Sequence, residues 1–175
     1  MKASEASHRI YARVAGITFL FYIIAGISSL ALPDQTLVAD VLPLLLNFSA
    51  IVLGVTLYMI TREQGPGLAL LALICRVLEA VHGESAIFFA VGSTLFSWLL
   101  LSGRMIPIAL AWLGVVASVL LVVILPLQLA GLFGGSMSWS ASITWIVWLP
   151  MLVFEVAFAL WLLIKGVVVP KTTAT

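Results

Sequence analysis

Long apolar runs alternate with short polar turns along the chain, and this pattern predicts α-helices that cross a membrane. A transmembrane helix needs about 20 consecutive apolar residues, and most of the runs approach that length. They do not alternate apolar and polar residues in segments of about 10, as the strands of a transmembrane barrel would. We therefore predict an all-α transmembrane bundle with six spans, at about residues 14–32, 41–60, 67–82, 85–101, 108–132 and 142–164.

The third and fourth predicted spans come from one apolar stretch, residues 67–101. A single helix of that length would measure about 52 Å, far more than the hydrocarbon core of about 30 Å. The stretch must therefore break, and Gly83, between His82 and Glu84, is the natural place.

Small residues four positions apart occur in two of the other spans. Ala50 and Gly54 form one such pair in the second span, and Gly114 and Ser118 form another in the fifth. This spacing allows two membrane helices to approach each other closely, so we expect helix contacts at these positions.

The composition also indicates a membrane protein. The chain has 175 residues, of which 63% are hydrophobic and 9% are charged, and its mean hydropathy is +1.27. A soluble domain averages about 45–50% apolar and about 25% charged residues, so lipid must solvate much of this surface. The net charge of +1 argues against a nucleic-acid partner. The single Cys75 cannot form an internal disulfide.

The distribution of basic residues predicts the orientation in the membrane. With six spans and the N-terminus inside, seven of the eight basic residues fall on the inner side: Lys2, Arg9, Arg13, Arg62, Arg104, Lys165 and Lys171. Inner loops are rich in Lys and Arg, so this pattern favours cytoplasmic N- and C-termini. We expect a cytoplasmic lead at residues 1–13, one transmembrane domain at 14–165 and a cytoplasmic tail at 166–175. Trp145 and Trp148 then fall near the outer interface.

Ionisable residues inside the predicted spans mark the candidate site. Arg76, Glu79 and His82 fall within a stripe about 120° wide on the third span. Counted from the inner ends of the helices, Arg76 lies about 14 Å deep and Glu155 of the sixth span about 15 Å deep. Asn47 of the second span comes out at about 21 Å. We therefore predict that the second, third and sixth helices pack together, with Arg76 bridging Glu79 and Glu155.

The charges in this cluster do not balance. Arg76 contributes one positive charge, whereas Glu79 and Glu155 contribute two negative charges if both ionise. Either one acid is protonated or His82 carries the missing charge, and both arrangements describe a site that could exchange a proton. The alternative is a structural clip that fixes helix register. In that interpretation, Asn47 forms an interhelical hydrogen bond and His82 belongs to a hydrated outer turn.

No metal site, cofactor or catalytic residue is predicted. Glu79 and His82 have the Glu-x-x-His spacing of di-metal bundles, but those need two such pairs and two further carboxylates. A haem site is disfavoured because His82 is the only histidine in a predicted span. The chain has no P-loop, no HExxH motif and no Ser-centred elbow. An enzyme is therefore not favoured, and an intramembrane enzyme is the only form left open.

Four segments of the chain form a recognisable pattern: residues 9–16 (RIYARVAG), 67–80 (GLALLALICRVLEA), 103–107 (GRMIP) and 155–166 (EVAFALWLLIKG). In these segments the chain resembles a bacterial domain-of-unknown-function family of multi-pass membrane proteins, number four-three-eight-six. The resemblance implies a six-helix bundle of uncharacterised function and supplies no substrate. It also implies that some polar residues belong to a shared pattern, namely Arg76, Glu79, Arg104, Glu155 and Lys165.

We therefore expect a small multi-pass protein of the bacterial inner membrane, of a binding or transport type, with its polar site between the second, third and sixth helices. Arg76 would meet an anion or carboxylate, and Glu79, Glu155 and His82 would handle protons. The alternative is an accessory subunit, in which the cluster only fixes packing and the lipid-facing surface binds other membrane proteins or a second copy of the chain. In both cases the lipid bilayer surrounds the protein.

Overall fold

The structure, a computed structural model, describes residues 2–29, 37–81, 85–132 and 142–168. Within these residues it contains six α-helices and no strand, which confirms the all-α prediction. The helices are α1 (Lys2–Ser29), α2 (Leu37–Thr61), α3 (Pro66–Val81), α4 (Ser85–Ser102), α5 (Ile108–Leu129) and α6 (Ser142–Ile164).

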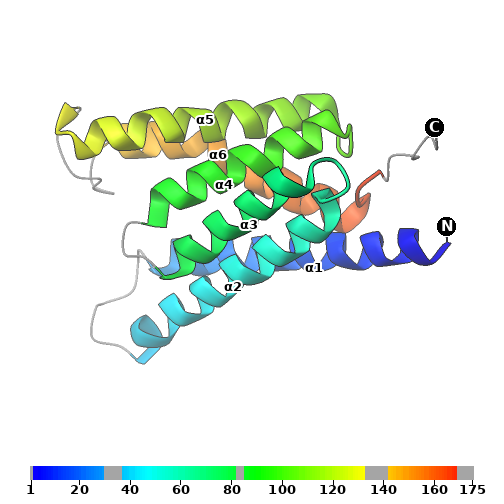
Figure 1. The fold of residues 1–175 in the computed structure, drawn as a ribbon. Helices are drawn as coiled ribbons and strands as arrows, with labels where there is room; N and C mark the ends of the chain where they lie inside the picture. Colours follow the sequence, from blue (N-terminus) through cyan, green and yellow to red (C-terminus); the bar gives the residue numbers. More distant parts are fainter. Residues whose placement is uncertain (1, 30–36, 82–84, 133–141, 169–175) are drawn as a thin grey trace.

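The helices pack as a closed ring in chain order. Each helix packs against the next one along the chain, and α6 packs against α1 to close the ring. The helices alternate in direction, so the start of α1 and the end of α6 lie at the same end of the bundle (Figure 1).

The ring corrects the predicted packing of the second, third and sixth helices. α3 packs mainly against α2 and α4, and α6 packs against α1 and α5. The predicted contact between the second and third helices is confirmed. The predicted contact of these two with the sixth was wrong because helices that are consecutive in the chain usually become neighbours in space. α3 and α6 instead face each other across the interior of the ring.

Four of the six helices are long and apolar enough to cross a membrane, over Ser7–Ser29, Val41–Thr61, Ile108–Leu129 and Thr144–Ile164. The other two share the apolar stretch at residues 67–101 and are shorter. α4 contributes the apolar segment Ala86–Ser102, and α3 has 16 residues, which corresponds to about 24 Å. A helical bundle of membrane type is therefore confirmed, and the count of six spans stays a prediction.

Large apolar side chains cover the outside of the bundle as well as its interior. Ile17, Leu44 and Val116 are each more than half exposed, whereas Leu53 and Phe158 are buried. Lipid solvates an apolar outer surface at no cost, so this distribution agrees with a membrane-embedded protein.

The helices approach one another closely at small residues. A Cβ atom added to Gly54 of α2 would lie 2.9 Å from the Cβ of Arg76 on α3. A Cβ added to Gly114 of α5 would lie 2.6 Å from the ring of Phe154 on α6. Both glycines come from the predicted small-residue pairs, and the close helix contacts expected there are confirmed.

The turn between α4 and α5 is closed by its own backbone. Arg104 adopts a positive φ of 49° and donates its N–H to the carbonyl of Leu101, while Met105 donates to Leu100. This pair of bonds is the Schellman motif, which ends a helix at a left-handed residue. The carbonyl of Met105 also accepts the N–H of Val168 at 2.9 Å, so the segment after α6 is tied to this turn.

Candidate functional site

The inward face of α3 carries an ion pair. Nη1 of Arg76 lies 2.7 Å from Oε2 of Glu79, and the two side chains are only 2% and 5% exposed. Residues three apart lie on the same face of a helix, which brings these two side chains together as the sequence predicts.

Side chains from α1 and α4 enclose this pair. The hydroxyl of Tyr22 on α1 donates a hydrogen bond of 2.9 Å to Oε1 of Glu79. The guanidinium of Arg76 lies 5.7 Å from the ring centre of Tyr22 and 5.1 Å from that of Phe89 on α4. Both distances permit a cation–π attraction. We call Arg76, Glu79, Tyr22 and Phe89 the Arg76 network.

Glu155 enters the interior from the opposite side, on α6. Its side chain is 6% exposed, and its Oε1 atom has no hydrogen-bond partner among the described residues. The charges of Arg76 and Glu79 act on it electrostatically. Within the described residues, however, the ion pair of Arg76 is with Glu79. Arg76 therefore does not bridge the two acids directly, because α3 and α6 face each other across the ring.

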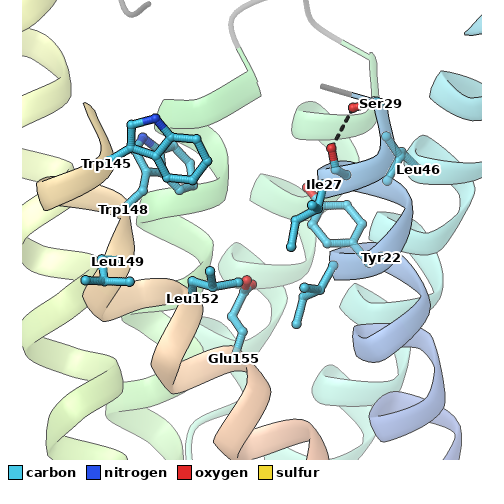
Figure 2. A pocket seen from close by; sticks show the side chains of 11 residues that line it. Tyr22, Ile27, Ser29, Leu46, Trp145, Trp148, Leu149, Leu152 and Glu155 are labelled. Atoms are coloured by element: carbon cyan, nitrogen blue, oxygen red, sulfur yellow. Dashed lines mark hydrogen bonds between the residues drawn. The ribbon is translucent and has the colours of Figure 1, made fainter. Parts of the chain in front are cut away.

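A pocket of about 280 Å³ lies between α1 and α6, with Leu46 of α2 on its edge. Figure 2 shows Trp145 and Trp148 along one part of its α6 wall and the carboxyl group of Glu155 pointing into the space between the helices. Tyr22 lies on the α1 wall. Among the described residues that line the pocket, Glu155 is the only charged one, so the pocket is an apolar and aromatic hollow with one acidic group.

The Arg76 network also positions aromatic side chains on the two sides of this pocket. Tyr22 lines the pocket and is anchored by its hydrogen bond to Glu79. The ring of Trp148 lies 5.5 Å from that of Phe89, which in turn faces Arg76. The buried ion pair therefore helps to orient two aromatic side chains of the pocket wall.

Not every predicted site residue joins this arrangement. The structure brings Arg76 and Glu79 into contact and places Glu155 across the ring from them. The side chain of Asn47 is exposed on α2 and does not line the pocket. His82 lies outside the described residues, so its predicted role stays a prediction.

Tyr22 is the residue that the sequence reasoning missed. In an apolar run a tyrosine is interpreted as a hydrophobic residue, and nothing in its neighbours shows that it faces α3. The available signal is its phenolic hydroxyl, because a buried Tyr hydroxyl usually finds a hydrogen-bond partner. Among the described residues no group of three or more His, Cys, Asp or Glu side chains is placed to hold a metal ion.

The fold and the pocket define a helical membrane protein with a buried ion pair and an acidic, aromatic cavity. Residues 81–166 match the model of a family described as Domain of unknown function (DUF4386), which confirms the resemblance predicted from the sequence. The match includes the turn at residues 103–107 and the closing segment at 155–166, whereas Arg76 and Glu79 precede it. No curated protein and no solved structure matches the chain.

Proposed function

We propose that this protein binds a small molecule in the pocket between α1 and α6, with Glu155 as the polar contact. The observation that carries the proposal is that Glu155 lines this pocket and has a buried carboxyl oxygen without a hydrogen-bond partner among the described residues. The volume of about 280 Å³ is close to the lower end of ligand pockets, which span about 300–1,000 Å³.

The two halves of the polar cluster have different roles in this proposal. Arg76 and Glu79 meet each other, and Tyr22 completes the pair, so this half acts as the structural clip. Glu155 forms no ion pair within the described residues. Its Oε1 is buried without a hydrogen-bond partner among them, as are Nε and Nη2 of Arg76, and burying an unpaired polar group costs stability. An unpaired carboxyl group that lowers the stability of the fold and lines a pocket is better explained by a role in binding than by a role in folding.

The arrangement of the helix ends supports a cytoplasmic location for both termini. The α2–α3 turn carries Arg62, and the α4–α5 turn carries Arg104. Both turns lie at the end of the bundle where α6 ends, and Lys165 follows α6 directly in the sequence (Figure 1). Basic loops favour the cytoplasmic side. The pocket is built from the second half of α1 and the part of α6 that ends at Glu155, so it would extend from the middle of a bacterial inner membrane toward its outer side.

Cysteine labelling in lipid nanodiscs tests whether the pocket admits small molecules. In a Cys75→Ser background, Leu152→Cys places a thiol on the pocket wall. The thiolate is the reactive form, so a pocket open to water allows this thiol to react with methyl methanethiosulfonate. Two control positions should not react: Leu121→Cys in the closed core, and Leu160→Cys on the outer, lipid-facing surface.

A variant that fills the pocket completes this experiment. Gly26 lines the pocket, and a Cβ added there would meet nothing within 4 Å. Gly26→Leu should therefore occupy the cavity without disturbing the bundle, and should slow labelling of the Leu152→Cys thiol at least about tenfold. If the thiol of folded Leu152→Cys protein is as unreactive as that of Leu121→Cys, the proposed function is refuted.

A further inference from the structure

Resting on the proposed function, we infer that the molecule bound in this pocket is a small organic cation, an amine or quaternary ammonium group on an apolar body, whose charge is met by Glu155. The inference goes beyond binding as such, because it names the charge and shape of the ligand. It is carried by the charges around the pocket, by the aromatic walls and by the way those walls are held.

The described interior leaves one acidic group, Glu155, without an ion-pair partner. The positive charge of Arg76 is met by Glu79 at 2.7 Å. Glu155 forms no ion pair within the described residues, and those of them that line the pocket include no Lys, Arg or His. A ligand that serves as the partner of the Glu155 carboxyl group must donate a hydrogen bond to it or carry a positive charge. When Glu155 is ionised, a cation also balances its charge. An ionised Glu155 would repel an anion placed beside it.

The walls of the pocket suit a cation with an apolar body. Tyr22, Trp145 and Trp148 supply three aromatic rings, and aliphatic side chains such as Leu152 supply most of the rest. The face of an aromatic ring attracts a cation, and the attraction is stronger where water is excluded. Aromatic rings around a single carboxylate are therefore a chemical match for alkylated ammonium groups.

Two of these rings are fixed before any ligand arrives. Tyr22 is anchored by Glu79, and Trp148 lies against Phe89 in the Arg76 network. Walls that are ordered in advance reduce the entropy lost on binding. The ion pair thus supports the pocket without itself touching the ligand.

A protection assay on the Leu152→Cys protein tests the ligand class. The probe is benzyltrimethylammonium, and its matched control is neopentylbenzene, which has the same shape and no charge. In the protein that retains Glu155, the cation should slow labelling of the introduced thiol at a concentration at least about tenfold lower than the neutral isostere. Adding Glu155→Gln should raise the concentration of the cation that is needed for the same protection by about tenfold or more. Adding Glu63→Gln instead, which removes a negative charge from the exposed α2–α3 turn, should leave it unchanged.

The outcomes separate the inference from the proposed function. If both compounds protect equally well and Glu155→Gln changes neither, the pocket binds small molecules and the inference of a cation is overturned. If the Leu152→Cys thiol reacts and the cation fails to protect it, the inference is overturned as well. If that thiol does not react in the folded protein, the proposed function itself fails. The comparison of cation with isostere needs no substitution at Glu155, so it remains decisive if Glu155→Gln does not fold.

Discussion

Removing one member of the Arg76–Glu79 pair should destabilise the bundle far more than removing both. Arg76→Met leaves Glu79 without its cation, and Glu79→Leu leaves the guanidinium without its carboxylate, in each case inside the ring of helices. The pair distance is 2.7 Å, and the side chains are 2% and 5% exposed, so water cannot replace the missing partner. Breaking a buried pair in this way costs about 3–5 kcal/mol.

The double variant Arg76→Met/Glu79→Leu removes both charges and keeps apolar volume in the interior. Replacing a buried ion pair by apolar residues of similar size is often neutral or stabilising. The hydroxyl of Tyr22 loses its acceptor, which costs about 1–3 kcal/mol. We therefore expect the double variant to lose about 1–3 kcal/mol, far less than the sum of the two single losses.

Equilibrium unfolding in mixed micelles with increasing dodecyl sulfate, followed by tryptophan fluorescence, measures these differences. Arg62→Met, at an exposed position in the α2–α3 turn, serves as the control for loss of one positive charge and should be near neutral. Additive losses in the double variant would show that the two residues are not coupled, and the structural clip would be refuted.

Three further predictions concern single positions. Gly54→Ala should cost about 1–3 kcal/mol, because the new Cβ would lie 2.9 Å from that of Arg76, whereas Gly67→Ala meets nothing and should be neutral or slightly stabilising in the same unfolding assay. Arg104→Gly should stabilise the protein by about 1–2 kcal/mol, because glycine adopts the positive φ of 49° without strain; Arg104→Ala, which keeps the strain, should show no such gain. Tyr22→Phe should cost about 1–3 kcal/mol through the lost hydrogen bond to Glu79, and an unchanged midpoint of unfolding would count against that bond.

The helical class and the polar face of α3 could be predicted because each depends on local pattern. Apolar runs of nearly membrane length specify the helices, and three-residue spacing alone places Arg76 and Glu79 together. The small-residue pairs likewise indicated where Gly54 and Gly114 meet neighbouring helices. These features follow from one helix at a time, or from one pair of positions.

The relation between helices could not be obtained in this way. Matching depths suggested that Glu155 reaches Arg76 directly, but depth leaves the order of helices around the ring undetermined. Asn47 has a suitable depth and yet is exposed, because the inward face of α2 is occupied by residues such as Ala50 and Leu53. The pocket could not be predicted either, because it depends on the order of the helices. It lies between α1 and α6, the first and last of the described helices, which come together only when the ring closes.

The unfolding free energies of Glu155→Leu and Glu79→Leu, compared in the same micelles without ligand, test most directly whether Glu155 serves binding rather than folding. Glu79 holds Arg76 and accepts the Tyr22 hydroxyl, so its loss should cost about 3–5 kcal/mol. Glu155 has a buried carboxyl oxygen without a hydrogen-bond partner among the described residues, so Glu155→Leu should leave stability unchanged to within about 1 kcal/mol or raise it. A loss at Glu155 as large as that at Glu79 would show that both acids are structural, and would contradict the assignment of Glu155 to a binding site.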